Sequence, residues 1–408
     1  MSPFQLTAAL LSLVAFAGWL NAKTLRLPNG VGMLIAGLIG AAALFMLHEL
    51  QVSAVDALIG TIAHIDFAQT VVGYMLAFLL FAGAMQVDLT AMIKRWLSIS
   101  ALATLGVAGS IVIVGFGLWL IASVSGVPLT LPWALAFGAL ISPTDPVAVL
   151  ATVKHGNLSK SLKVILEGEA LFNDGVGIVA FTALLALATG AGNAAPLHVV
   201  WDIVLQALGG LVFGTVLSAL VIRAMGTLDD FMVEVSMTIA LAMVSYAGAQ
   251  ALGLSGAIAV VGAGMLFGGE RAKRAMAGET ETYLKAFWTL VDEILNALLF
   301  LLLGVEMLAV PFVSKDIGLL AAAVPLVILS RLIVVAPWGF YQKAKGEKGA
   351  TAILGWGGLH GALSLALALS LPEGPERALL LAVTYVVVAF SITVQGLTFS
   401  PLTRRLQG

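Results

Sequence analysis

Long apolar runs separated by short polar loops fill almost the whole of this 408-residue chain. A helix that crosses a bilayer needs about 20 mainly apolar residues, and its backbone polar groups must be satisfied within the segment. Thirteen runs fit this requirement, and each is predicted to be a transmembrane helix. They cover residues 4–21, 30–47, 68–86, 97–122, 132–152, 164–188, 199–224, 231–251, 255–269, 284–309, 317–342, 350–371 and 377–401. The stretch 51–66 carries two aspartates and is predicted to lie at the membrane interface.

Charge is too scarce for a water-soluble protein. Only 10% of the residues are charged, whereas soluble domains have about 25%. We therefore expect one transmembrane unit over residues 1–408, without a soluble domain. No phosphate-binding loop of the form G-x-x-x-x-G-K-[ST] occurs, which argues against an ATP-driven pump. The net charge of −2 gives no reason to expect a nucleic-acid partner, and the lack of cysteine excludes disulfides and thiolate metal sites. No cofactor is expected.

The loops alternate in their content of lysine and arginine. Seventeen of the 20 basic residues fall in loops on one side of the predicted membrane, and only Lys315 and Arg377 fall on the other. Arg331 lies inside a run. Because cytoplasmic loops carry the excess of basic residues, this pattern predicts an N-terminus outside and a C-terminus in the cytoplasm of a plasma (inner) membrane.

Two of the predicted helices are interrupted near their centres. The run 132–152 contains Ser142-Pro143-Thr144-Asp145-Pro146, and each proline removes a backbone N–H and disfavours helix in the residue before it. The run 350–371 contains four glycines within Gly355–Gly361. If helices one to six and eight to thirteen are inverted repeats, these two are equivalent. Such a pair indicates a transporter site where the broken helices cross, although ordinary kinks are the alternative.

Four ionisable residues lie deep in apolar runs, where charge is costly and therefore indicates function. They are Asp145, Glu169, Asp174 and Arg331. At about 100° per residue, Asp174 lies about 140° around its helix from Glu169. The arginine cannot lose its charge, so we predict a structural ion pair between Glu169 and Arg331. This leaves Asp174 free to bind either a proton or a metal ion, and such exclusive binding is itself an exchange mechanism.

Three neighbouring polar residues have open roles. Asp145 could be an ion ligand or could balance the positive ends of the half-helices. Thr144 and Asn173 could act as ligands or supporting groups, or could join helices through hydrogen bonds. Asn173 lies about 40° from Glu169 on the same helix.

The segments Ser142–Val149 and Glu169–Gly175 resemble those of the sodium/proton antiporters of the NhaP and sodium–proton exchanger family. Arg331 and the segment Gly357–Ala362 match this family too. The resemblance implies an all-α polytopic antiporter fold with 13 transmembrane helices, inverted repeats and two crossing broken helices. It also implies a homodimer with core helices at about 68–188 and 317–401 that move like an elevator.

In that family, the aspartate matching Asp174 binds the ion and the residue matching Thr144 helps to coordinate it. The residue matching Asp145 lies close by, Asn173 matches a supporting residue, and an Asn-Asp pair accompanies electroneutral exchange. The resemblance thus makes Asp174, Thr144, Asp145 and Asn173 the expected ion-binding residues, with Asp174 and Thr144 as Na⁺ ligands. Glu169 and Arg331 match the family's ion pair.

Three residues depart from the family pattern. Ala82 stands where many prokaryotic members carry a glutamate, and Ala170 stands where some carry a serine ligand. His360 replaces the usual arginine of Gly-Leu-Arg-Gly. Because histidine titrates near neutral pH, our hypothesis is that His360 modulates the pH dependence of the site.

These features predict electroneutral Na⁺(Li⁺)/H⁺ antiport in which the proton and the cation compete for Asp174. K⁺/H⁺ antiport stays open, because the sequence does not rank alkali ions. A proton-coupled organic solute carrier is a rival, but few polar and aromatic residues surround the predicted crossing. An intramembrane enzyme would need a paired acid or a Ser-His arrangement, which is not found in a credible context, so no enzymatic activity is expected. One shared carboxylate also favours exchange over conduction through a channel.

Overall fold

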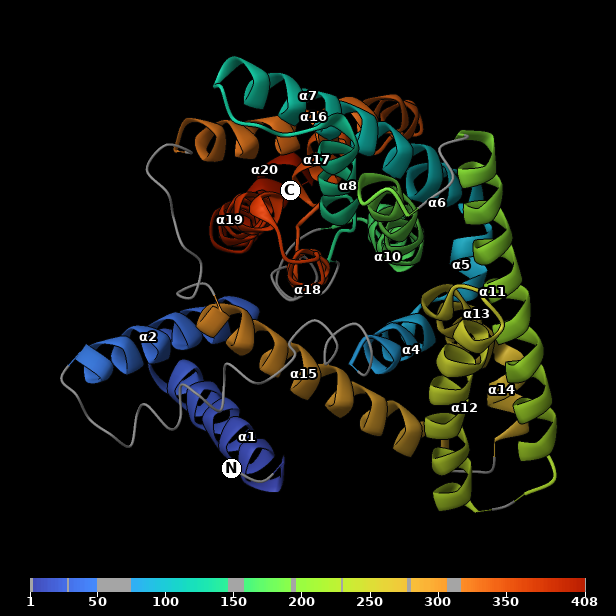
Figure 1. The fold of residues 1–408 in the computed structure, drawn as a ribbon. Coiled ribbons are helices and arrows are strands. Elements are labelled where there is room, and N and C mark those ends of the chain that lie inside the picture. Colours follow the sequence, from blue (N-terminus) through green and yellow to red (C-terminus); the bar gives the residue numbers. More distant parts are fainter. Residues whose placement is uncertain are drawn as a thin grey trace.

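The computed structural model describes residues 3–27, 29–49, 75–145, 158–191, 196–228, 230–276, 280–306 and 317–407. Every regular element in these ranges is a helix, with π-helical segments marked η (Figure 1). The elements up to α10 are α1 (Pro3–Leu20), η1 (Asn21–Leu25), α2 (Asn29–Glu49), α4 (Leu76–Gln86), α5 (Leu89–Ile93), α6 (Trp96–Ala101), η3 (Leu102–Gly106), α7 (Val107–Val124), α8 (Leu131–Ile141) and α10 (Lys160–Ala188). The later elements are α11 (Pro196–Met225), α12 (Phe231–Ala251), α13 (Gly256–Phe267), α14 (Glu270–Ala275), α15 (Thr280–Glu306), α16 (Ile317–Ala344), α17 (Ala350–Trp356), α18 (Ala362–Leu369), α19 (Pro375–Phe390), η6 (Ser391–Gln395) and α20 (Gly396–Gln407).

Helices long and apolar enough to cross a membrane recur along the described chain. Seven meet that standard by length and composition, and four shorter apolar helices accompany them. Each of the thirteen predicted runs overlaps a helix of the structure, and the all-α polytopic class is confirmed. The count of thirteen crossings stays a prediction. The stretch 51–66 lies outside the described residues.

The helices form two groups, which Figure 1 shows as separate clusters. We call α6, η3, α7, α8, α10, α16, α17, α18, α19, η6 and α20 the broken-helix unit, since α7 packs on α8 and α16, and α8 packs on α10. We call α1, α2, α4 and α11 to α15 the scaffold unit, in which α15 packs on α2 and α13 packs on both α11 and α4. The predicted core limits of 68–188 and 317–401 remain a prediction, and within them α4 packs with the scaffold unit.

Very close backbone contacts hold α13 in the middle of the scaffold unit. A Cβ atom on Gly214 of α11 would lie 1.8 Å from the carbonyl oxygen of Ala259 in α13. A Cβ atom on Gly268, at the end of α13, would lie 2.3 Å from the carbonyl oxygen of Met85 in α4. Small residues let membrane helices approach this closely. These glycines therefore set the position of α4 relative to α13. Helix α4 forms one wall of the cavity described below.

Candidate ion-binding site

Helical structure stops inside both of the runs that the sequence marks as interrupted. Helix α8 ends at Ile141, and residues 142–145 continue without helical structure. Helix α17 ends at Trp356, and α18 begins only at Ala362. The two non-helical segments meet, because the backbone N–H of Asp145 donates a hydrogen bond of 2.7 Å to the carbonyl oxygen of Leu359. The predicted interruption of the second run and its contact with the first are confirmed, whereas residues 146–157, with Pro146 and the rest of the first run, lie outside the described residues.

Two glycines of the second segment make room for charged side chains. A Cβ atom on Gly361 would lie 2.7 Å from Oδ2 of Asp145. A Cβ atom on Gly358 would lie 2.4 Å from Nε of Arg331. The glycine-rich sequence is therefore needed for close approach as well as for breaking the helix.

Glu169 of α10 and Arg331 of α16 form an ion pair inside the broken-helix unit. Both guanidinium nitrogens Nη1 and Nη2 donate to the carboxylate, the second at 2.8 Å to Oε2. Nη2 also lies 3.3 Å from the carbonyl oxygen of Leu354 in α17. Glu169 is 1% exposed and Arg331 is 7% exposed. The pair thus ties α10 and α16 to the helix that precedes the second break, and bidentate geometry makes it strong.

Asn173 connects α10 to the first break. Its Nδ2 donates a hydrogen bond of 2.8 Å to Oγ1 of Thr144, and its Oδ1 accepts from the backbone N–H of Thr144 at 3.4 Å. Both residues are buried. The Asn173 amide therefore fixes the Thr144 side chain. It also satisfies the backbone N–H of Thr144, which in a helix would donate to a backbone carbonyl.

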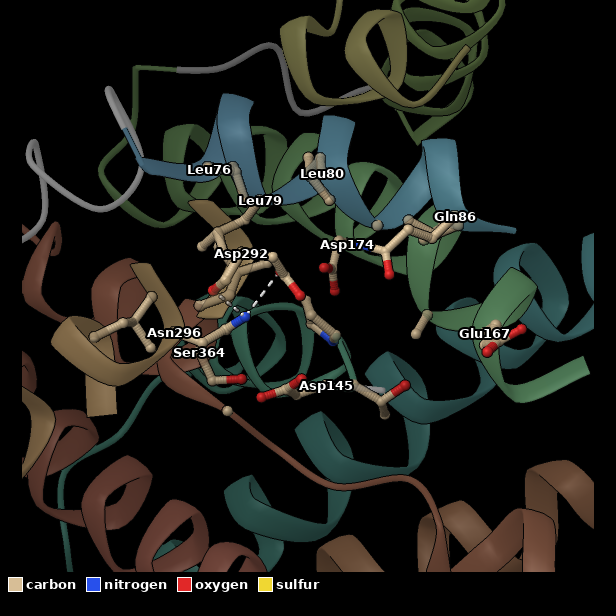
Figure 2. Close-up of a pocket in the computed structure, with 18 of the residues that line it drawn as sticks. Leu76, Leu79, Leu80, Gln86, Asp145, Glu167, Asp174, Asp292, Asn296 and Ser364 are labelled. Carbon is tan, nitrogen blue, oxygen red and sulfur yellow. Dashed lines mark hydrogen bonds between the residues drawn. The ribbon is translucent and has the colours of Figure 1, made fainter. Parts of the chain in front are cut away.

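Asp174 lies beside a cavity between the two units, as Figure 2 shows. The cavity has a volume of about 170 Å³. Thr144, Asp145 and Asp174 line it, whereas Asn173 does not. Among the described lining residues, four carry carboxylates, Asp145, Glu167, Asp174 and Asp292, and none is basic. Asp145 is close enough for its charge to act on both Asp174 and Asp292. The cavity is therefore suited to cations.

Comparison with known proteins decides the family. A family model described as the transmembrane region of sodium/hydrogen exchangers matches residues 10–405. The chain belongs to the sodium/hydrogen exchanger family. The resemblance drawn from the broken-helix and Asn-Asp motifs is thereby confirmed.

Full-length relatives of this exchanger have consistent descriptions. It is 39% identical to the Na⁺/H⁺ antiporter NhaP of Pseudomonas aeruginosa, over 98% of this chain and 96% of that protein. It is 33% identical to the Na⁺/H⁺ antiporter NhaH of Halobacillus aidingensis, over 94% and 93% of the two chains. The solved structure of the sodium proton antiporter MjNhaP1 from Methanocaldococcus jannaschii matches with a TM-score of 0.74 over 100% of both chains, at 18% identity. This match shows that the exchanger has the antiporter fold.

His360 of the exchanger is buried behind the crossing. Its Nδ1 lies 3.2 Å from the carbonyl oxygen of Pro143, and its backbone N–H donates to Oγ of Ser391 at 2.8 Å. The ring does not line the cavity. It reaches the site through the backbone of the first break, so its predicted influence on pH dependence would be indirect.

The structure adds polar residues to the cavity that sequence reasoning did not place there. Asp292 and Asn296 of α15 line it, and neither is among the ion-binding residues expected from the sequence. Ser364 of α18 also lines the cavity and was not singled out at all. Gln86 and Glu167 complete this set. Asp292 and Asn296 are four residues apart, which places both side chains on one face of a helix. This spacing was the one sign in the sequence that the two residues act together.

Two of the departures from the family pattern have different positions. Ala170 lines the cavity, so it contributes a methyl group where a serine would contribute an oxygen. Ala82 is fully buried in α4 and does not line the cavity.

Proposed function

We propose that this exchanger is a secondary active antiporter that exchanges Na⁺ or Li⁺ for H⁺ without net charge movement. The observation that carries the proposal is the cavity with four carboxylates and no basic residue among its described lining residues. Arg331 could neutralise a carboxylate there, but Glu169 holds it inside the broken-helix unit. The Na⁺/H⁺ antiport by which the relatives are named supports Na⁺ and H⁺ as the exchanged ions.

The mechanism rests on competition at Asp174, with Thr144 as the neighbouring oxygen ligand and Asn173 as its support. A carboxylate in a partly desolvated cavity binds either a proton or a small cation, because both occupy the same oxygen atoms and compensate the same charge. One cation therefore displaces one proton, and the exchange is electroneutral. Asp145 acts from the crossing, where its charge raises the affinity of the cavity for cations.

The size of the cavity argues against an organic solute. Pockets that bind small organic molecules usually have volumes of roughly 300–1,000 Å³. The cavity here has about 170 Å³, which holds a partly hydrated alkali ion. Whether K⁺ replaces Na⁺ is decided by the measurement below.

Topology and assembly are part of the proposal. The cavity is lined by Gln86 at the end of α4 and by Glu167, two turns into α10. These ends adjoin the loops rich in lysine and arginine, so we infer a cavity that faces the cytoplasm of a multi-pass inner-membrane protein. A homodimer with movement of the broken-helix unit against the scaffold unit would then carry the ion across.

Proteoliposomes with an inside-acidic ΔpH and a quenched pH dye test the function. We expect Na⁺ or Li⁺ to restore the fluorescence with the wild-type protein and to have no effect with Asp174→Asn. Abolishing the membrane potential with valinomycin and K⁺ is expected to leave the initial rate unchanged. If none of Na⁺, Li⁺ and K⁺ dissipates ΔpH, or if Asp174→Asn performs like the wild type, the proposal is wrong.

A further inference from the structure

The polar groups of the cavity fall into two clusters on opposite walls. Asp174 and Thr144 belong to one, on α10 and the first break. Asp292 and Asn296 of α15 lie on the scaffold side, and Ser364 of α18 lies beside them, as Figure 2 shows. The mechanism proposed above uses only the first cluster, so the second cluster needs an explanation of its own.

The side chains of Asp292 and Asn296 are fixed relative to each other. Nδ2 of Asn296 donates to Oδ1 of Asp292 and to its backbone carbonyl oxygen, each at 2.9 Å. The amide nitrogen is thereby directed toward its own helix, and the amide oxygen Oδ1 remains as an acceptor without a hydrogen bond to any described residue. A carboxylate and an amide oxygen are thus available on one face of α15.

Ser364 provides an independent indication that a ligand binds here. It is 1% exposed, and its Oγ has no hydrogen-bond partner among the described residues. Many helical hydroxyls in this protein donate to the carbonyl four residues earlier, as Thr182 does to Ile178, although Ser245 and Ser330 do not. Ser364 is the third residue of α18, so the residue four positions earlier, His360, lies in the non-helical segment. A buried hydroxyl without a partner is costly unless something else binds it.

The chemistry of these three groups selects a monovalent cation. Carboxylate, amide and hydroxyl oxygens are hard ligands suited to hard cations. Among the described residues, no group of three or more acidic, histidine or cysteine side chains could hold a metal ion. One carboxylate with two neutral oxygens compensates a single positive charge.

We propose that Asp292, Asn296 and Ser364 form a second site for the transported alkali cation, separate from Asp174 and in the same cavity. This inference rests on the proposed exchange function and deepens it. A cation at this site bridges α15 of the scaffold unit and α18 of the broken-helix unit. Asp145 lines the same cavity and acts electrostatically on both Asp174 and Asp292, so its charge favours a cation at either site and assists transfer of the ion to Asp174.

The test measures initial exchange rates in proteoliposomes against the concentrations of Li⁺, Na⁺ and K⁺. We expect Ser364→Ala and Asn296→Ala to raise the apparent KM for the transported cation about three- to tenfold, because each removes one oxygen ligand. The maximal rate should change little, since Asp174 is intact. The ratio of apparent KM values between cations should change as well. Asp292→Asn should raise KM further, and Asp292→Glu should recover part of the loss.

Two matched controls separate a ligand role from other effects. Ser330→Ala removes another buried hydroxyl without a partner among the described residues, but one that does not line the cavity. Glu293→Gln removes a negative charge from the exposed neighbour of Asp292 on the same helix. Ser330→Ala should retain the wild-type KM for every cation. The charge of Glu293 acts on Asp292 from outside the cavity, so Glu293→Gln should leave the ratios of KM between cations unchanged.

The possible failures are distinguishable. A wild-type protein without cation-dependent exchange would overturn the proposed function and this site together. An active wild-type protein whose Ser364→Ala and Asn296→Ala variants retain its KM values and cation ratios would overturn this site alone. The site is also overturned alone if only Asp292→Asn changes KM, by one factor for all three cations, because that result indicates a general electrostatic effect.

Discussion

Arg331 carries the only fixed positive charge among the buried residues that the structure describes. Its guanidinium group is held by both carboxylate oxygens of Glu169, and it does not line the cavity. Asp174 lies only five residues from Glu169 on the same helix, yet the two carboxylates have opposite roles because they face different sides of α10. The electrostatic character of the cavity therefore depends on a pair outside it.

Removing either partner of this pair should be more harmful than removing both. Glu169→Leu or Arg331→Met leaves one buried charge without its counter-charge, which costs about 3–5 kcal/mol of stability. The double variant should recover most of that loss, because two apolar side chains need no charged partner. Thermal unfolding in detergent is the measurement. Additive losses in the double variant would show that the pair is not coupled as described.

His360 offers a residue-scale prediction about pH. His360→Arg would place a permanent positive charge beside Pro143, whose carbonyl oxygen His360 contacts, and close to the carboxylates of the cavity. A nearby cation favours the ionised form of a carboxylate, so competition with protons should weaken. We expect the pH–rate profile of exchange to shift toward lower pH. Superimposable profiles of wild type and variant would contradict an influence of residue 360 on the site.

Helix interruptions were predictable at the scale of elements because their causes are local. Pro143 and the glycines of 355–361 act on their own backbone, so the ends of α8 and α17 follow from the sequence. The ion pair between Glu169 and Arg331 was also predictable, because a buried arginine needs a carboxylate and few acidic residues lie deep in the apolar runs. The position of Ser364 was not predictable, since whether a hydroxyl faces a cavity depends on helices distant in sequence.

The crossing of the two breaks should tolerate no added atom at Gly361. Gly361→Ala places a Cβ atom 2.7 Å from Oδ2 of Asp145, although the backbone angles at this position suit alanine. The displaced carboxylate should lower the exchange rate about tenfold or more. Gly318→Ala in α16 is the control, because its Cβ atom would meet nothing within 4 Å. Normal exchange by Gly361→Ala would mean that the close contact is not needed.

At the scale of the whole molecule, the site is a property of two units. Asp174, Thr144 and Ser364 come from the broken-helix unit, whereas Asp292 and Asn296 come from the scaffold unit. Relative movement of the units would therefore separate the two halves of the cavity and change access to Asp174. The sequence predicted the residues of the first half from motifs within two helices, but the second half required the packing of α15 against α18.

Topology can be tested directly because the chain contains no cysteine. We expect a membrane-impermeant maleimide to label Glu373→Cys in intact spheroplasts, since that loop is predicted to face outside and its side chain is 88% exposed. Lys345→Cys, in a loop predicted to be cytoplasmic, should react only after the membrane is opened. The reverse pattern would invert the topology and place the cavity opening on the outer side.

Competition between a cation and a proton at Asp174 is the central claim, and proton release on cation binding tests it most directly. Na⁺ is added to weakly buffered, detergent-solubilised protein, and the change in pH is recorded. We predict release of about one proton per exchanger molecule in Asp292→Asn, where Asp174 is the remaining carboxylate at which the cation replaces a proton. Adding Asp174→Asn to this variant should abolish the release. Saturable Na⁺ binding to Asp292→Asn without proton release, or equal release from the double variant, would contradict the account.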